Sequence, residues 1–279
     1  MAPEAVAPVA APQPMVVVDG LDALTPSLGR LFVVVGVFDG LHLGHLYLLQ
    51  HLRSLAAQRN AQAAVVTFDH HPDEILTGAA PPLLCDPQER LERLEAAGVA
   101  VTVVQTFDLA LRITPFDAFV RRISDRAPLA GFLMTPDAAF GFERRGTVDA
   151  VTELGRSIGY EVVVIPPFDV DGQPVRSADI RTAIANGDLS TAARLLGRDV
   201  SVTGRVEPVG EERRLAFDLP VALPPTGEYH VVAVAALGPG RQLVRGTGMV
   251  TIAGPESVLL QVDGIPSGER TRITFATRE

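Results

Sequence analysis

Residues 30–45 read RLFVVVGVFDGLHLGH, which places an apolar run, a turn with glycines and the start of a helix in direct succession. The run at 32–37 is rich in β-branched residues, which pack well in strands. After the turn, apolar residues recur at helical spacing from residue 48 to residue 56. This stretch therefore predicts a strand that passes through a glycine-bearing turn into a helix, as at the opening of a βαβ unit.

The alternation of short apolar runs and amphipathic stretches continues to about residue 167. It predicts an α/β fold with a parallel sheet and right-handed crossovers. A turn at 171–174 then leads into two short segments with helical spacing. The further expected strands are 63–68, 99–105, 129–134 and 160–165, and the expected helices begin at Pro87 and span 178–185 and 189–196.

Beyond Gly197 the pattern changes to short alternating runs separated by Pro and Gly, without a long helical period. This pattern predicts a small antiparallel β-barrel or sandwich. We therefore expect one domain over residues 15–197 and a second over 198–279, preceded by a disordered Ala/Pro-rich tail over 1–14. The expected strands of the second domain are 200–206, 228–234, 257–262 and 272–275.

The composition excludes several classes of function. The 279 residues carry 24 Lys and Arg against 33 Asp and Glu, and none of the 24 is lysine. The lack of lysine excludes a Walker-A phosphate loop and a Schiff-base mechanism. The net charge of −9 argues against a nucleic-acid partner. The single cysteine, Cys85, excludes an internal disulfide and a multi-cysteine metal site.

The cell compartment is predicted from what the chain does not contain. The first fourteen residues lack the basic region of a signal peptide, and no apolar run is long enough to span a bilayer. With only one cysteine, this predicts a cytoplasmic globular protein that has no membrane partner. The sequence leaves open the oligomeric state and whether translation starts at Met1 or Met15.

Polar, glycine-bearing segments follow the expected strands. They lie at 36–45, 67–72, 135–141 and 176–181. In an open parallel sheet, ligands bind beyond the carboxyl ends of the strands, at the point where the strand order reverses. We therefore expect these four segments to converge on one ligand site.

The first segment has the composition of a phosphate site. Gly36, Gly40 and Gly44 allow sharp turns and the close approach of a ligand. His42 and His45 can share one face at the start of a helix, where free amides and imidazoles favour an anion. The alternative is a tight turn with two surface histidines, but the position between a strand and a helix favours phosphate binding.

These residues resemble the adenylyltransferase half of bacterial bifunctional FAD synthetases, which belong to the His-x-Gly-His nucleotidylyltransferases. The resemblance implies a Rossmann-like nucleotidylyltransferase domain followed by a riboflavin-kinase-like barrel. It also implies transfer of AMP from ATP to FMN, which gives FAD and pyrophosphate, with Mg²⁺ arriving together with ATP. The motifs that carry it are 36–45, 67–72, Phe140-Gly141 and 146–149, in the family's order.

The resemblance assigns roles to residues of all four segments. His42, His45 and Arg181 are expected to act on the phosphates as catalytic residues. The phosphate of FMN is already an anion, so the site needs alignment and charge neutralisation and no strong base. The expected nucleotide-binding residues are Gly36, Phe38, Asp39, Gly40, Gly44, Ser177 and Ile180, and the expected flavin-binding residues are Asp69, His71, Asp137 and Phe140.

A metal site in the second segment is the competing interpretation, because histidines and a carboxylate are adjacent at 69–71. Neighbouring residues that leave a strand tend to point to opposite faces, which separates such ligands. We therefore predict no metal ligands in the chain itself.

The chain departs from the family's pattern in several places. His70 stands where proline is usual, and 135–139 lacks the first glycine and one aromatic residue. At 176–181 one serine and the threonine hydroxyl are missing, whereas Arg181 remains as a bidentate phosphate donor and Arg176 adds a charge that can compensate. Loss of the two hydroxyls is expected to weaken the phosphate interaction by about 1 to 3 kcal/mol.

The second domain resembles the riboflavin kinase barrel through its strands and residues 225–229. The kinase motif of the family contains a Thr and an Asn around Mg-ATP, but residues 216–221 read AFDLPV in this chain. Both functional side chains are therefore missing. We expect this half not to phosphorylate riboflavin.

Three functions remain open at this point. The leading hypothesis is an FMN adenylyltransferase with a degenerate kinase-like domain. A catalytically silent flavin- or nucleotide-binding protein is suggested by the altered third and fourth segments. Transfer to another phosphate-bearing acceptor is permitted by His-x-Gly-His alone, but the Thr-Phe-Asp-x-His-Pro element at 67–72 favours flavin.

Overall fold

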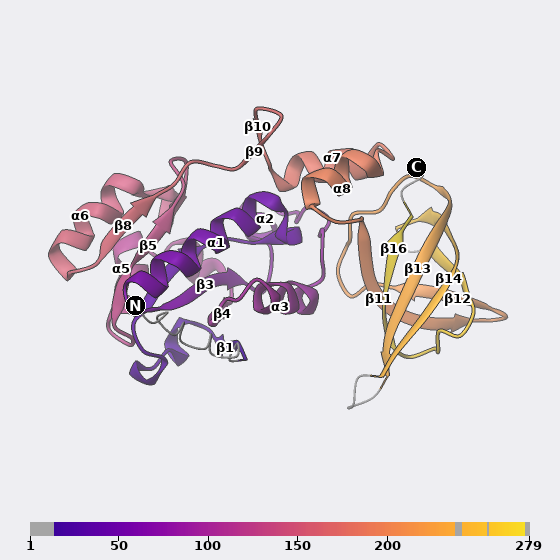
Figure 1. The fold of residues 1–279 in the computed structure, drawn as a ribbon, viewed down its shortest axis with the longest axis horizontal. Coiled ribbons are helices and arrows are strands. Elements are labelled where there is room, and N and C mark those ends of the chain that lie inside the picture. Colours follow the sequence, from indigo (N-terminus) through magenta and orange to yellow (C-terminus); the bar gives the residue numbers. More distant parts are fainter. Residues whose placement is uncertain (1–13, 238–241, 256, 277–279) are drawn as a thin grey trace, which may run out of the picture.

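The computed structural model describes residues 14–237, 242–255 and 257–276, which form an α/β domain followed by a barrel (Figure 1). The α/β domain is built on a six-stranded parallel sheet, and the barrel is a closed sheet of six antiparallel strands. Both parts of the predicted fold are confirmed. The tail predicted over 1–14 lies outside the described residues, apart from Pro14. Within the described ranges, no helix is long and apolar enough to cross a membrane.

The parallel sheet has the strand order β1-β4-β3-β2-β5-β8. From β2 the chain proceeds to β3 and β4 on one side and then returns to place β5 and β8 on the other. The order of the strands therefore reverses between β2 and β5, which fixes where a ligand site is expected. The strands are β1 (Val16–Asp19), β2 (Leu31–Val35), β3 (Gln62–Phe68), β4 (Val101–Gln105), β5 (Leu129–Met134) and β8 (Glu161–Val164).

Helices cover both faces of the sheet because successive strand residues point to opposite sides. On β2, Phe32 packs in one apolar cluster with Leu49 of α1 and Leu94 of α3. Val33 packs in a second cluster with Phe119 of α5. The helices of this domain are α1 (Leu43–Gln58), α2 (Pro72–Thr77), α3 (Pro87–Ala96), α4 (Leu109–Arg112), α5 (Phe116–Ser124) and α6 (Val148–Ile158).

The barrel closes in the order β11-β12-β15-β14-β13-β16, and its interior is aliphatic and aromatic. On β13, Val231, Ala233 and Ala235 alternate inward, and Ile273 and Phe275 of β16 do the same. Strands β12 and β14 were not predicted from the sequence pattern. The strands are β11 (Ser201–Val209), β12 (Glu212–Ala216), β13 (Gly227–Leu237), β14 (Gln242–Gly254), β15 (Ser257–Val262) and β16 (Arg270–Phe275).

Two helices, α7 (Ser177–Ala185) and α8 (Leu189–Leu196), lie between the sheet and the barrel (Figure 1). Ile180 and Leu196 belong to the same apolar cluster as the barrel interior. Gly197 ends α8 in the left-handed conformation. The change of sequence pattern at Gly197 marks where the barrel strands begin. By side-chain packing, however, α7 and α8 also belong with the barrel.

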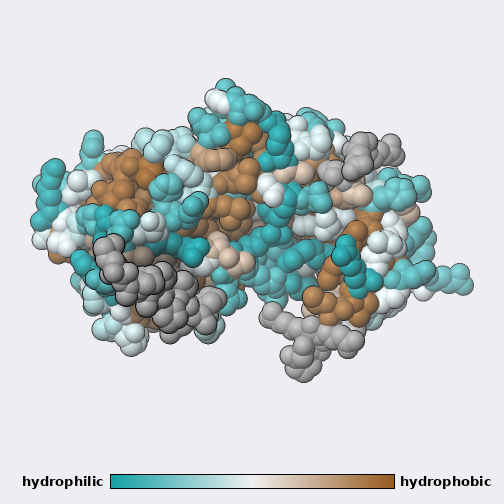
Figure 2. Space-filling view, in the orientation of Figure 1, coloured by the Kyte–Doolittle hydropathy of each residue, from teal (hydrophilic) through white to brown (hydrophobic). Residues whose placement is uncertain are grey.

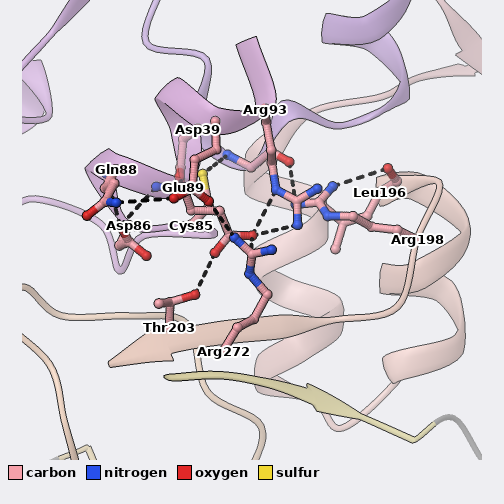
Figure 3. A network of polar contacts seen from close by, with 12 residues as sticks. Asp39, Cys85, Asp86, Gln88, Glu89, Arg93, Leu196, Arg198, Thr203 and Arg272 are labelled. Carbon is pink, nitrogen blue, oxygen red and sulfur yellow. Dashed lines mark hydrogen bonds and ion pairs between the residues drawn. The ribbon is translucent and has the colours of Figure 1, made fainter. Parts of the chain in front are cut away.

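A buried carboxylate on α3 connects the α/β domain to the barrel (Figure 3). Glu89 has no exposed side-chain surface. It accepts hydrogen bonds from Arg93 Nε at 2.8 Å and from Thr203 Oγ1 of β11 at 2.8 Å. Arg272 Nε of β16 lies 3.4 Å from the same carboxylate. One acidic side chain is thus shared by a helix of the first domain and two strands of the second.

Further polar contacts extend this junction between the domains. Arg270 of β16 pairs with Asp86 at 2.8 Å and with Glu92 at 3.2 Å, both next to or on α3. On the face shown in Figure 2, hydrophilic residues lie along the junction, and apolar patches lie to either side of it. The ion pairs of Arg270 thus add to the contacts of Glu89 at this junction.

Backbone hydrogen bonds also cross the junction, at residues 220–222. The amide of Leu83 donates to Pro220 O at 2.8 Å, and the amide of Ala222 donates to Leu83 O at 2.8 Å. Leu83 and Val221 form an isolated parallel bridge. Residues 220–222 are therefore held against the α/β domain.

Candidate active site

A pocket of about 560 Å³ opens at the carboxyl ends of β2, β5 and β8. Gly36 lines it after β2, residues 135–137 line it after β5, and residues 165–168 line it after β8. The start of α7 completes the wall. This is the position at which the strand order reverses, and the volume lies within the range of about 300 to 1,000 Å³ that is usual for small-molecule sites.

The turn between β2 and α1 is conformationally strained. Phe38 has φ 54° and Leu41 has φ 41°, although neither is glycine. Such left-handed residues cost of order 1 to 3 kcal/mol each and cluster at functional sites. Between them, Gly40 has φ 79°, and a Cβ there would lie 2.8 Å from Leu84 Cβ. The turn is thus held in a shape that it would not adopt on its own.

This turn delivers the two imidazoles predicted from the sequence into the pocket wall. His42 is the N-cap of α1, and its Nδ1 accepts the amide hydrogen of His45 at 3.3 Å. The two rings stack with centroids 3.7 Å apart and an interplanar angle of 18°. Gly44 permits this stacking at close range, because a Cβ there would lie 3.2 Å from the His42 ring and 3.3 Å from Val175 O.

Both imidazoles are held in the neutral form. Burial lowers the pKa of His42 to about 4, with further lowering by the guanidinium groups of Arg198 and Arg181. Burial also lowers the pKa of His45 well below its usual value, with a smaller contribution from His42. Neutral imidazoles can stack without charge repulsion and can still donate a hydrogen bond to an anion.

His45 carries an unsatisfied polar atom. Its Nδ1 is buried and has no hydrogen-bond partner among the described residues. A buried polar atom without a partner costs about 1 to 3 kcal/mol. Phe38 packs beside the ring, with centroids 5.0 Å apart, and limits its movement.

Asp39 organises a buried cluster next to the pocket and does not line the pocket itself. Its carboxylate accepts the amide of Leu84 at 2.9 Å and the guanidinium of Arg181 at 2.6 Å. The Nε of Arg181 donates to Pro82 O at 2.8 Å. Arg181, which the sequence analysis expects to contact phosphate, is thus committed to Asp39 and to the 82–84 backbone in this structure.

The start of α7 reaches the pocket through Arg176 and Ser177. Ser177 is the first residue of α7 and not its N-cap, and its hydroxyl donates to Asp39 O at 3.2 Å. Arg176 occupies the N-cap position without a side-chain capping bond. Asp137, which follows β5, also lines the pocket and accepts the hydroxyl of Thr135 at 2.9 Å.

The predicted flavin-side residues Asp69 and His71 lie outside the pocket lining. Asp69 accepts the amide of Phe107 at 3.0 Å and the amide of His70 at 2.7 Å. These hydrogen bonds lower its pKa, although burial opposes them. His71 is the N-cap of α2. Burial lowers its pKa; among nearby charges, Asp73 raises the pKa and Arg181 lowers it, each by less than burial does.

The structure therefore divides the predicted site residues into three groups. One group lines the pocket, a second forms polar clusters beside it, and a third packs in apolar cores or supports the turn. The lining group is Gly36, Phe38, His42, Gly44, His45, Asp137 and Ser177; the polar group is Asp39, Asp69, His71 and Arg181; the packing group is Gly40, Ile180 and Phe140.

Sequence reasoning missed several residues that shape the site. Arg90 of α3 donates to Phe68 O at 2.6 Å and to Val37 O at 3.2 Å, so it ties together the ends of β3 and β2. Arg198 donates to Gly40 O at 2.7 Å from the start of the barrel domain. In the sequence, each of these arginines is simply a basic residue on a helix or in a connecting segment. Nothing in that pattern indicates that its side chain will bind a distant backbone carbonyl.

The lone cysteine also supports the turn. The amide of Gly40 donates to Cys85 Sγ at 3.3 Å, and burial raises the pKa of the thiol to about 12. Neighbouring Asp39 and Glu89 add to this rise. The thiol is therefore fully protonated and packed beneath the strained turn.

The apolar wall of the pocket was not predicted either. Tyr47 of α1 and Phe168 after β8 both line it, with ring centroids 5.4 Å apart. Phe168 follows an expected strand, and Tyr47 lies one turn beyond His42, so both positions were accessible to the sequence argument. Within the described ranges, no group of three or more His, Cys, Asp or Glu side chains is arranged to hold a metal ion.

Two relatives with curated names are similar to much of this chain. The chain is 33% identical over 194 residues to a "Bifunctional riboflavin kinase/FMN adenylyltransferase" of Haemophilus influenzae, covering 69% of this chain and 63% of the relative. It is 29% identical over 233 residues to the protein of the same name from Escherichia coli K12, covering 80% and 74%. The match to the Haemophilus protein thus spans less than two thirds of that relative's length.

A solved structure shares the arrangement of both domains. It is titled "Crystal Structure of Macrolide-efflux Protein from Streptococcus pneumoniae", has a TM-score of 0.75 and 21% identity, and is matched over 94% of this chain and 89% of its own. At this identity the likeness supports the fold alone. A sequence model described as FAD synthetase matches residues 25–179, which include the pocket and more than half of the chain. The chain therefore belongs to the FAD synthetase family.

Proposed function

We propose that the chain is an FMN adenylyltransferase, which transfers AMP from ATP to FMN and releases pyrophosphate. The observation that carries this proposal is the stacked imidazole pair in the wall of a pocket at the strand reversal, with His45 Nδ1 buried and unpartnered. An oxygen of the FMN phosphate attacks the α-phosphorus of ATP. The bond from that phosphorus to the pyrophosphate oxygen breaks, and pyrophosphate leaves with the electron pair.

The chain's own residues supply alignment and hydrogen bonding for this exchange. The attacking oxygen is already ionised, so neutral His42 and His45 suit the reaction as hydrogen-bond donors and no general base is needed. A hydrogen bond to a charged acceptor is stronger than one to a neutral acceptor, so these bonds strengthen as negative charge accumulates on the phosphate oxygens. Tyr47 and Phe168 line the same pocket and provide an apolar surface against which a planar ring of a substrate, such as adenine or the flavin, can pack.

Magnesium belongs to the substrate in this proposal. Mg²⁺ keeps several water ligands and is commonly bound through the phosphates of ATP. Asp137 is the single carboxylate among the described pocket-lining residues.

The acceptor flavin is placed near Asp137 in this proposal. Asp69, His71 and Phe140 are the remaining residues on the flavin side.

The barrel is proposed not to phosphorylate riboflavin. Residues 216–221 lack the Thr and Asn of the family's kinase motif, and Pro220 is hydrogen-bonded to Leu83 of the other domain. A purified protein that converts riboflavin and ATP to FMN would contradict this part of the proposal.

The decisive experiment mixes the purified chain with FMN, ATP and Mg²⁺ and quantifies FAD and pyrophosphate. Equal amounts of both products support the proposal. A silent binding protein is the second candidate, because Arg181 is held by Asp39 and Pro82 O and does not reach into the pocket. Binding of FMN and ATP without turnover would support that candidate. Binding of ATP without binding or turnover of FMN would point to another acceptor.

A further inference from the structure

Arg176 is a cation without a partner in the pocket wall. Its side chain is exposed, lines the pocket, and forms no hydrogen bond or ion pair within the described residues. Its backbone is fixed, because its carbonyl accepts the amides of Asp179 and Ile180 at 3.2 and 3.3 Å. The structure thus anchors the base of this side chain and leaves the guanidinium available.

The segment before Arg176 also fixes its position. The short hairpin of β9 (Asp169–Val170) and β10 (Gln173–Pro174) returns the chain to the pocket, and the amide of Val175 donates to Phe168 O at 3.1 Å. Phe168 and Val175 both line the same pocket. Arg176 therefore enters the pocket wall from a closed loop base and at the start of a nine-residue helix.

The pocket has little other positive charge. His42 and His45 are neutral because burial lowers the pKa of each. Arg181 is paired with Asp39 and is not part of the lining. The lining residues include one carboxylate, that of Asp137, and one side chain with a permanent positive charge, that of Arg176. Among the described lining residues, Arg176 is thus the fixed cation that a polyphosphate in the pocket can contact directly.

We propose that Arg176 binds the β- and γ-phosphates of the nucleoside triphosphate and holds the pyrophosphate as it leaves. This inference rests on the proposed function and names the residue that recognises the leaving group. A guanidinium can donate two parallel hydrogen bonds to phosphate oxygens, which suits a group that gains charge as its bond to the α-phosphorus breaks. The imidazoles then face the α-phosphate, and the two sets of donors divide the triphosphate between them.

The test compares ligands that differ only in the outer phosphates. Calorimetric titration of the full chain with MgATP, pyrophosphate and AMP is carried out for wild type, Arg176→Gln and Arg176→Lys. We expect Arg176→Gln to weaken ATP and pyrophosphate binding by about ten- to a hundredfold and AMP binding by less than about twofold. Arg176→Lys, which keeps the charge and loses the bidentate geometry, should recover part of the loss.

Arg156→Gln is the matched control. Arg156 is an exposed arginine of α6 with 72% of its side-chain surface accessible, and it lies outside the pocket lining. It should bind all three ligands as wild type does. Equal losses for ATP and AMP, or no loss for either, would overturn the role of Arg176.

The two proposals can fail separately. If ATP binding depends on Arg176 but no FAD forms, the adenylyltransferase activity is wrong and the polyphosphate contact stands. If the Arg176→Gln variant forms FAD with the same rate and the same KM for ATP as wild type, the adenylyltransferase activity is supported and the contact between Arg176 and the outer phosphates is wrong. If the wild-type chain binds neither ATP nor pyrophosphate, both are wrong.

Discussion

The parallel sheet and the barrel use the ends of their strands in different ways. In the α/β domain the sheet stays open, and the segments after β2, β5 and β8 turn outward and leave a pocket between them. In the barrel every strand is paired on both sides, and its interior is filled by residues such as Val231, Ile273 and Phe275. A ligand pocket needs strand ends that are not covered by other side chains. In the part of the chain that the structure describes, the open sheet has such strand ends and the closed barrel does not.

The same contrast separates chemistry from stability. A change at the open sheet edge should alter the reaction, whereas a change at the barrel or the junction should alter folding.

Replacing His45 by Ala should lower the rate of FAD formation by about 100- to 1,000-fold, because it removes a positioned hydrogen-bond donor from the phosphate site. Product formation from FMN and ATP measures this directly. His230→Ala provides the barrel counterpart, since His230 is exposed on β13 and lies outside the pocket. That variant should retain activity within about twofold; comparable losses in the two variants would contradict the division.

Replacing Glu89 by Ala should lower the free energy of unfolding by about 2 to 4 kcal/mol, because it leaves Thr203 and two guanidinium groups without their buried partner. Urea unfolding measures the change, and Glu89→Gln provides a milder variant if the alanine protein does not fold. Glu153→Ala, at a side chain that is 72% exposed, should stay within about 0.5 kcal/mol of wild type. A junction that does not stabilise the chain would show no difference between the two sites.

The stability of the α/β domain should fall as pH falls through the range from about 6.5 to 4. His42 has a pKa of about 4 when folded and 6.5 as its reference value, so the unfolded chain takes up its proton first. Above pH 6.5, His42 is neutral in both the folded and the unfolded chain, so it does not reduce the free energy of unfolding. Between pH 7 and pH 5, protonation of the unfolded chain should lower the free energy of unfolding by on the order of 2 kcal/mol, and the loss continues towards pH 4. His42→Asn keeps a capping side chain without titrating, so its urea midpoint should depend less on pH. Identical pH profiles would refute the role of burial at this imidazole.

Replacing Arg270 by Ala should cost no more than about 1 kcal/mol in unfolding free energy. Its side chain is 31% exposed, and solvent screens its ion pairs with Asp86 and Glu92. The same urea experiment detects the change, which should be clearly smaller than that of Glu89→Ala. A larger loss would mean that the outer part of the junction contributes more than its buried centre.

Local patterns predicted most of the sheet and part of the barrel. β5, α8 and β15 have the predicted bounds, because alternation or helical spacing and a clear turn define each of them. β12 and β14 were missed, since β12 is short and charged and β14 contains glycines that weaken its pattern. The association of α7 and α8 with the barrel depends on which apolar surface meets which, and spacing along one helix does not contain that information.

The candidate site was predictable only in its local parts. His42, Gly44 and His45 are neighbours in sequence, so one motif indicates their shared position. The pairing of Arg181 with Asp39 spans 142 residues and depends on how the 82–84 segment folds between them. A motif predicts which side chains are present near a site, and only the fold decides whether a given charge is free for a ligand or is used within the protein.

The position of Cys85 has a practical consequence. A cysteine reacts with thiol reagents through its deprotonated sulfur, which attacks the reagent, and the sulfur of Cys85 is both buried and held in the protonated form next to the Gly40 amide. Because the chain has one cysteine, labelling with such a reagent reports on a single place, where the turn, α3 and the barrel meet. The native protein thus carries its own reporter for how often the turn around Gly40 opens.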